Sequence, residues 1–151
     1  MMSLCLRYVR ERNDAVEVLN DTWLKVFSQL ARYDASKGAL YTWMRTILIN
    51  TALDALRKQK IIRKREMRAM GGEEAGIDND AISKLSGDEL LSFISRLPVT
   101  TRVVFNLYTI DGFSHREIAD MLEISEGTSR WHLSDGRRQL KLIIHLMESK
   151  T

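Results

Sequence analysis

The residues with the clearest capacity for chemistry lie between positions 113 and 138. We expect hydroxyl groups, an indole, a histidine and three arginines on the outer face of one helix there, at Thr128, Ser129, Arg130, Trp131, His132, Arg137 and Arg138. Hydroxyl and guanidinium groups are the donors that contact phosphates and base edges. The set indicates DNA binding, and a plain packing hairpin of two helices is the competing interpretation.

Catalysis is not indicated anywhere in the chain. His115, His132 and His145 are scattered, and Cys5 is the single cysteine, so neither a nucleophile with its base nor a thiolate metal cluster is predicted. No glycine-rich phosphate loop appears. We therefore expect a protein that is not an enzyme and has no cofactor and no metal site.

Two short helices with a tight turn must position the cationic residues. Ser114 is expected to cap the first helix while Glu117 reaches back to it, which is a capping box. Ser125 is expected to cap the second helix, and Glu123 and Ile124 alone separate the two. So short a connection predicts a helix-turn-helix. Its inward-facing residues are expected to be Ile118, Ala119, Leu122, Leu133 and Leu140.

The remainder of the chain is expected to be helical too. It has one proline and no long alternation of apolar and polar residues, which argues against a sheet. Apolar spacing predicts helices over 14–30, 39–67, 88–96 and 100–111. Their predicted buried residues are Val16, Leu19, Trp23, Phe27 and Leu30, then Trp43, Ile47, Thr51 and Leu56, then Val103, Val104, Leu107 and Tyr108. The fold class predicted is all-α.

Charge divides the chain into two parts. The net charge is only +3, but a basic run over 57–68 is followed by an acidic stretch over 73–89. Glycine and acids over 70–79 predict a flexible acidic linker. We expect two small helical domains over 1–68 and 86–151, with the linker over 69–85. The single cysteine and the lack of a signal peptide or a long apolar run fit a cytoplasmic protein with no membrane insertion.

Taken together, these segments resemble the bacterial RNA polymerase sigma factors of the sigma-70 family, in its compact extracytoplasmic-function (ECF) group. Residues 14–27 look like the family's polymerase-binding helix, 43–57 like its minus-10-reading helix, and 97–108 with 112–119 like its region 4. The resemblance implies a transcription initiation factor whose partners are core RNA polymerase, promoter DNA and an anti-sigma factor.

The resemblance also assigns roles to residues. Polymerase binding would fall to the polar edge formed by Glu17, Asn20, Asp21 and Lys25. Minus-10 binding would fall to Tyr33, Lys37, Asn50, Arg57 and Lys58, with Tyr33 beside a pocket for a flipped base. Minus-35 binding would fall to Thr128, Ser129, Arg130, His132 and Arg137. Without the resemblance, the first of these sets reads as an ordinary solvated helix face.

Three features depart from the family pattern. The first helix of the region 2-like domain starts late and looks truncated. Glu123 stands where the family commonly has glycine, so either a left-handed backbone there costs about 1 kcal/mol or the turn adopts another shape. At 134–136 the family often carries arginine and alanine, whereas here Asp135 is expected to put a negative charge near DNA and Gly136 to loosen the helix.

Two alternatives remain. A regulator that binds an operator without polymerase would explain residues 97–145 but would leave the motif at 14–57 without a purpose. A sigma-like protein impaired in promoter use, which titrates polymerase or an anti-sigma factor, would fit the short N-terminus and Asp135. Binding to core polymerase and transcription from a matched promoter separate these readings from the sigma factor.

Overall fold

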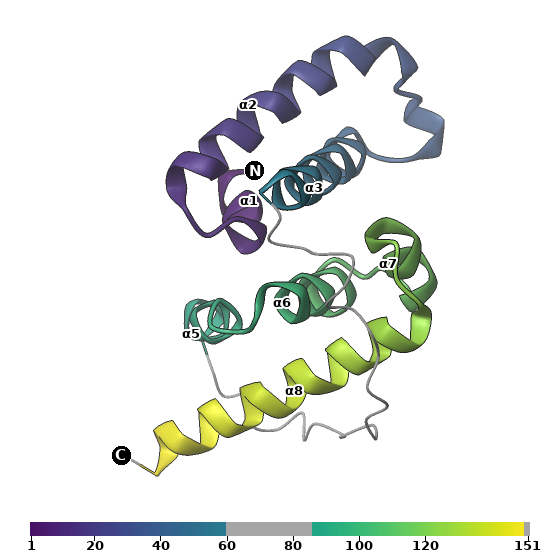
Figure 1. Cartoon of the computed structure of the whole chain (residues 1–151). Helices are drawn as coiled ribbons and strands as arrows, with labels where there is room; N and C mark the ends of the chain where they lie inside the picture. The colour runs from purple at the N-terminus through teal and green to yellow at the C-terminus, as the bar shows by residue number, and fades with distance from the viewer. Residues whose placement is uncertain (60–85, 150–151) are drawn as a thin grey trace. The chain divides into compact units, whose positions relative to one another are not determined.

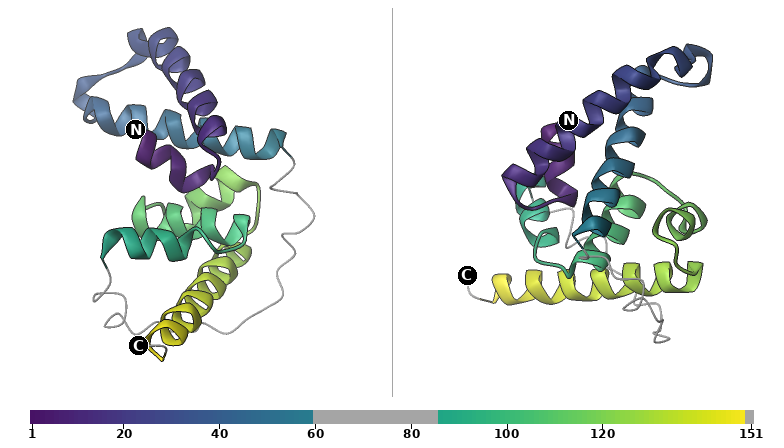
Figure 2. Two further views of the ribbon diagram at one scale, coloured as in Figure 1. Left: turned by 90° about the vertical axis from the view of Figure 1, so that its left-hand side faces the viewer. Right: turned by 45° about the horizontal axis from the view of Figure 1, so that its top comes forward.

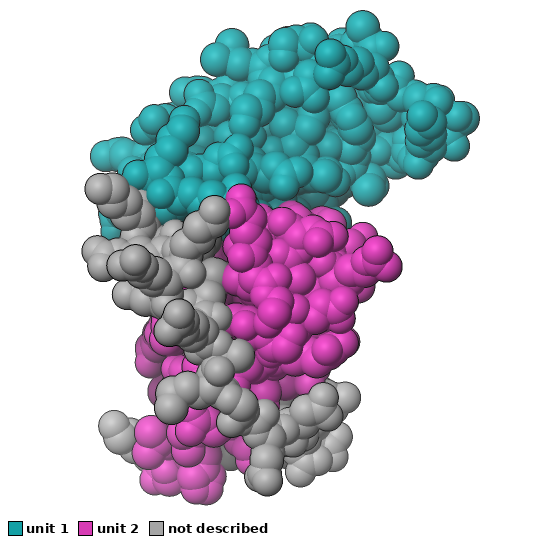
Figure 3. Space-filling model, turned by 45° about the vertical axis from the view of Figure 1, so that its right-hand side comes forward, with its two compact units in different colours: residues 1–61 teal, residues 62–151 magenta. Residues whose placement is uncertain are grey.

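The computed structural model describes residues 1–59 and 86–149. The chain divides into two compact units, Met1–Ile61 and Ile62–Thr151, which Figure 3 colours separately. Within the described ranges the regular structure is helical and no strand occurs, which confirms the all-α prediction. The predicted linker over 69–85 and most of the basic run lie outside the described residues, so those boundaries stay predictions.

The first unit is built on a helical hairpin (Figures 1 and 2). Helices α2 (Arg12–Gln29) and α3 (Leu40–Lys58) pack against each other, and α1 (Met2–Tyr8) packs on both. The loop between α2 and α3 holds two short 3-10 turns, η1 (Leu30–Arg32) and η2 (Ala35–Lys37). Its core contains fully buried side chains from all three helices, among them Tyr8, Val18, Leu48, Ile49 and Leu53.

The buried stripe predicted for α2 is wrong. The side chains turned inward are small or β-branched, namely Ala15, Val18, Thr22 and Val26. The larger residues lie outside, with Trp23 36% and Phe27 70% exposed. Val16 and Leu30 are exposed as well. Small side chains let α2 approach α3 closely, so size and not hydrophobicity alone decides which face is buried.

Helix α3 buries the second half of its predicted stripe. Thr51 and Leu56 are buried, whereas Trp43 and Ile47 are half-buried. The described part of the helix ends at Lys58, and the extension predicted to Met67 lies beyond the residues that the structure describes.

The second unit consists of helices gathered along one long helix. These are α5 (Gly87–Ile94), α6 (Val99–Phe105), the π-helical turn η3 (Asn106–Ile110), α7 (His115–Leu122) and α8 (Glu126–Glu148). Helix α8 packs against α5, α6 and α7, as Figure 1 shows. Val103, Val104 and Leu107 are buried as predicted, but Tyr108 is 36% exposed.

Gly136 has a packing role that differs from the predicted loosening of the helix. A Cβ at this position would lie 3.0 Å from the γ-methyl group of Thr101 and 3.4 Å from the Phe105 ring. The absent side chain therefore lets α8 cross α6 at close range, in the middle of the second unit.

Candidate nucleic-acid interface

Helices α7 and α8 form the predicted helix-turn-helix. The Ser114 amide donates to Glu117 Oε2 at 2.8 Å, and the Glu117 amide donates to Ser114 Oγ at 3.2 Å, which confirms the capping box. The Ser114 amide and hydroxyl both donate to the Glu117 carboxylate, and these two hydrogen bonds lower the pKa of that carboxyl group. Glu123 ends α7 in the left-handed conformation, with φ 55° and ψ 45°. The Thr128 amide then donates to Ser125 Oγ at 3.0 Å, which caps α8.

Three of the predicted minus-35 residues are not on the surface. Thr128, Ser129 and His132 are 4%, 0% and 6% exposed, so the exposure predicted for them is wrong. Each instead bonds within the second unit. The Thr128 hydroxyl lies 2.9 Å from Ser125 Oγ, and Ser129 Oγ lies 2.9 Å from Nδ1 of His115. These side chains therefore stabilise the buried side of α8 and its N-terminal turn.

His132 holds α8 to α6. Its Nδ1 lies 3.0 Å from Thr101 Oγ1, while its Nε2 is buried with no hydrogen-bond partner. Burial lowers the pKa of His132, and the nearby Asp135 carboxylate offsets part of that shift. Burial therefore favours the neutral imidazole, and this side chain is not part of the exposed cationic surface.

The outward face of α8 is a continuous stripe at helical spacing, which we call the reading face. Its members are exposed or half-exposed, and they are Gly127, Arg130, Trp131, Ser134, Arg138 and Lys141. Arg137 is half-buried at its edge. Sequence reasoning missed Ser134 and Lys141 as site residues. Both follow from the register once Leu133, Gly136 and Leu140 are known to face inward.

The carboxylates next to the reading face are neutralised within α8. Arg130 Nη2 donates to Glu126 Oε2 at 3.0 Å, and Arg138 Nη2 donates to Asp135 Oδ1 at 2.6 Å. The Asp135 side chain is only 9% exposed and also accepts from Gln139. Asp135 thus lies beside the reading face, but its carboxylate is paired and largely buried, and its effect on DNA affinity stays a prediction.

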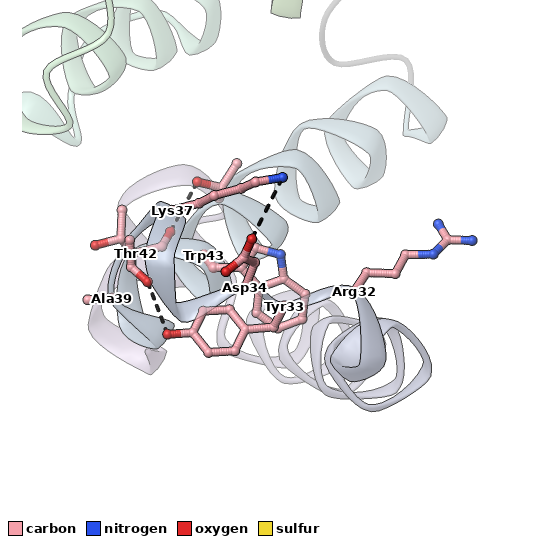
Figure 4. A pocket seen from close by; sticks show the side chains of 9 residues that line it. Arg32, Tyr33, Asp34, Lys37, Ala39, Thr42 and Trp43 are labelled. Atoms are coloured by element: carbon pink, nitrogen blue, oxygen red, sulfur yellow. Dashed lines mark hydrogen bonds and ion pairs between the residues drawn. The ribbon is translucent and has the colours of Figure 1, made fainter.

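In the first unit, the loop after α2 forms a pocket of about 310 Å³, drawn in Figure 4. Its lining includes both predicted loop residues, Tyr33 and Lys37, together with Trp43. The Tyr33 ring packs 5.5 Å from the Trp43 ring, and its hydroxyl donates to the Gly38 carbonyl oxygen at 3.0 Å. Lys37 lies 3.9 Å from Asp34. An aromatic wall next to polar groups suits a planar, hydrogen-bonding ligand.

A second hollow, of about 380 Å³, lies between α2 and α3. It brings together residues assigned to two different partners, because Glu17, Asp21 and Lys25 line it with Arg57 and Lys58. Lys25 is turned into this groove and not toward the outer edge of α2. Its Nζ lies 3.1 Å from Thr51 Oγ1 and 3.7 Å from Asp54.

Asp54 lies between Lys25 and Arg57, two of the cations that line this groove. Its other oxygen accepts from Arg57 at 2.8 Å, so the Arg57 guanidinium is already paired in the structure. Asn50 and Lys58 are exposed on α3, as a role in contacting nucleic acid requires.

The outer face of α2 combines polar and apolar groups. Glu17, Asn20 and Asp21 are exposed as predicted. Trp23 and Phe27 follow Asn20 at helical spacing, and their rings lie 6.1 Å apart. Leu24 is 69% exposed beside them. These apolar residues were missed as site residues because their spacing fits a core stripe equally well.

Comparison with known proteins agrees with this geometry. The description "Sigma-70 region 2" matches residues 1–61, and "Sigma-70, region 4" matches residues 87–140. The ECF RNA polymerase sigma factor SigK of Mycobacterium ulcerans is 25% identical over 143 residues, which cover 91% of this chain and 76% of that protein. The ECF RNA polymerase sigma-E factor of Haemophilus influenzae is 26% identical over 149 residues, which cover 91% and 78%.

The fold is shared with a solved structure of the same kind. The sigma factor RpoE from Bartonella quintana, solved in complex with the anti-sigma factor NepR, superposes with a TM-score of 0.60 at 17% identity. The match covers 96% of this chain and 89% of that one.

The chain belongs to the sigma-70 family of transcription initiation factors, in its extracytoplasmic-function group. It is thus a sigma factor, a member of a family of non-enzymatic transcription factors that direct RNA polymerase to promoters. Within the residues that the structure describes, no helix is long and apolar enough to cross a membrane.

Proposed function

We propose that this chain, bound to core RNA polymerase, reads the minus-35 element with the reading face of α8 and the minus-10 element with the first unit. The reading face carries the proposal. It follows a capped helix-turn-helix and presents Arg130, Arg138 and Lys141 on one side of α8, with the adjacent carboxylates neutralised. Recognition helices contact base edges with their N-terminal residues and phosphates around them.

Arg130 is the residue on which minus-35 binding depends most. Its pairing with Glu126 is solvent-exposed, with side chains 53% and 44% exposed, and such pairs contribute about 0–1 kcal/mol. DNA can therefore compete for the guanidinium. A contact from Arg130 to a guanine edge or a phosphate would replace that weak pair.

For the minus-10 element we propose a flipped base in the pocket beside Tyr33 and Trp43. The two rings form an aromatic wall, and Lys37, whose side chain is 83% exposed, can reach the backbone of a single strand. Asn50 and Lys58 on α3 would continue the contact. Stacking of a base on an aromatic ring contributes about 1–3 kcal/mol.

For polymerase binding we propose the outer face of α2. Carboxylates at Glu17 and Asp21 flank an apolar surface that contains Trp23, Leu24 and Phe27. Interfaces commonly combine a buried aromatic centre with a charged rim. This arrangement supports a larger interface than the polar edge alone, and it explains why such large apolar groups are exposed in the free chain. The place of action is then the cytoplasm, with an anti-sigma factor as a further partner.

The test is co-purification with bacterial core RNA polymerase, followed by run-off transcription on a promoter library. Asp21→Lys should weaken binding to core polymerase, while Arg130→Ala should leave binding intact and lower initiation about 5- to 150-fold, as loss of one good base contact predicts. Asp88→Lys and Arg10→Ala are the matched charge controls, since both residues are exposed and lie outside the proposed surfaces.

The outcomes separate the remaining readings. No binding to core polymerase would favour a regulator that binds DNA alone. Binding without initiation from any promoter would favour a sigma-like protein that titrates polymerase or an anti-sigma factor. Equal loss of polymerase binding in Asp21→Lys and Arg130→Ala would contradict the division of labour between the two units.

A further inference from the structure

Trp131 occupies the centre of the reading face. The buried side of α8 runs through Leu133, Gly136, Leu140 and Ile144. Since a helix turns by about 100° per residue, Trp131 points away from that line, to the side that Arg138 shares. Over residues 126–138, which the structure describes throughout, it is the one aromatic side chain that is not buried.

Trp131 is half-buried, and its neighbours on the outward face leave part of its ring uncovered. Gly127, one turn before it, has no side chain, and Ser134, one turn after it, has a small one. The indole meets the His132 ring edge-on, with centroids 4.9 Å apart and planes at 76°. His132 is itself buried and bonded to Thr101, so the indole rests against a fixed surface. A large apolar group is therefore held above a part of the helix that DNA can approach closely.

Among the groups that base pairs present in the major groove, the C5-methyl group of thymine is the apolar one. The first two turns of a recognition helix are the part that contacts base edges. An indole fixed in the second turn of α8 offers a broad apolar surface that suits that methyl group and a single donor, Nε1–H, whereas the several donors of Arg130 beside it suit phosphates and hydrogen-bonding base edges.

We propose that Trp131 recognises the methyl group of a thymine in the minus-35 element, and so determines part of the promoter specificity of this chain. The inference rests on the proposed function, because it assumes that the reading face enters the major groove. It adds the base that is read and the side chain that reads it.

The experiment compares thymine with uracil, which differ in that methyl group alone. Holoenzyme is assembled from the full chain and bacterial core polymerase, and a promoter is selected from a library. Each thymine of its minus-35 element is replaced in turn by deoxyuridine, and the affinity of holoenzyme for each duplex is measured. At one position we expect the affinity of holoenzyme for the duplex to fall about fourfold, which is the effect of removing one buried methyl group.

Variants assign that loss to the indole. Trp131→Ser should bind the thymine and uracil duplexes equally, while Trp131→Phe should keep a preference for thymine. Arg130→Ala should lower binding to both duplexes by the same factor. Thermal unfolding of each variant checks that α8 stays folded. If Trp131→Ser proves unstable, the preference of Trp131→Phe for the thymine duplex over the uracil duplex still tests the inference.

Two results would overturn the inference. One is a wild-type chain that binds all uracil-substituted duplexes as well as the original, which would place Trp131 against sugar or protein. The other is Trp131→Ser with an unchanged preference for thymine. Both results differ from failure of the proposed function itself. In that case holoenzyme would not initiate transcription, or initiation would not depend on Arg130, and the inference about Trp131 would lose its basis as well.

Discussion

The turn of the helix-turn-helix stores backbone strain at Glu123 that one substitution should release. Its φ of 55° and ψ of 45° lie in the left-handed region, which costs a residue with a Cβ about 1–2 kcal/mol. Glycine relieves that cost but loses about 0.4–1 kcal/mol through the greater freedom of the unfolded chain. Glu123→Gly should therefore stabilise the second unit by about 0.5–1 kcal/mol, which raises its melting temperature by roughly 2–8 °C.

The assay must report on the second unit alone. The chain has three tryptophans, and replacing Trp23 and Trp43 by phenylalanine leaves Trp131, in the second unit, as the single tryptophan, whose fluorescence can be excited selectively over that of tyrosine. Thermal unfolding followed by its fluorescence then compares the parent with Glu123→Gly. Glu123→Ala is the matched control, because it removes the carboxylate and keeps the Cβ, and it should bring no gain.

Two results would refute the reasoning about this turn. If Glu123→Ala stabilised the unit as much as Glu123→Gly, the cause would be the charge and not the backbone. If Glu123→Gly left the melting temperature unchanged or lowered it, the left-handed conformation would not be a source of strain.

Three further predictions concern buried sites. Burial lowers the pKa of His132 from 6.5, so below about pH 6.5 the unfolded chain binds more protons than the folded one. The free energy of unfolding should be highest above that pH and fall as the pH falls toward the pKa of the folded state. A free energy of unfolding in urea that stays constant between pH 7 and pH 5 would contradict this. Gly136→Ala should destabilise the second unit by about 1 kcal/mol. The new methyl group would crowd Thr101, whose hydroxyl lies within hydrogen-bonding distance of His132, at a cost of about 1–3 kcal/mol. This cost outweighs the gain of about 1 kcal/mol in helix propensity. The control is Gly127→Ala, where the nearest atom is 3.7 Å away and no loss is expected. Burial raises the pKa of the Cys5 thiol to about 11, so alkylating reagents at pH 8 should label it only after denaturant unfolds the chain, and rapid labelling of native protein would show that the site opens.

Local signals in the sequence were enough to predict the helix-turn-helix. Ser114 with Glu117, and Ser125, act within one turn of the chain, so their capping roles can be predicted without knowledge of the rest of the fold. The left-handed conformation at Glu123 was indicated instead by the resemblance, because the family commonly has glycine at this position. All of these features are confirmed by the structure.

Which faces are buried could not be predicted so well, because distant partners decide it. On α2, two sets of apolar residues share the helical period, and close packing against α3 selects the set with small side chains, such as Ala15 and Thr22. On α8, Ser129 and His132 look like surface residues until His115 and Thr101 are found beside them. Those partners lie 14 and 31 residues away along the chain.

The ion pairs along α8 have a consequence for how promoter binding responds to salt. Each phosphate that a cation neutralises normally releases condensed counterions, and log K then falls with log salt by about 0.9 per phosphate. Arg130 and Arg138 already carry counterions of their own, the carboxylates of Glu126 and Asp135. In the binding that we propose, phosphates displace these carboxylates, which remain beside the DNA and retain cations there, so fewer cations are released and the dependence on salt is weaker. Promoter binding by this helix would then depend less on the phosphate charge, which all DNA sequences share, and more on DNA shape and base edges.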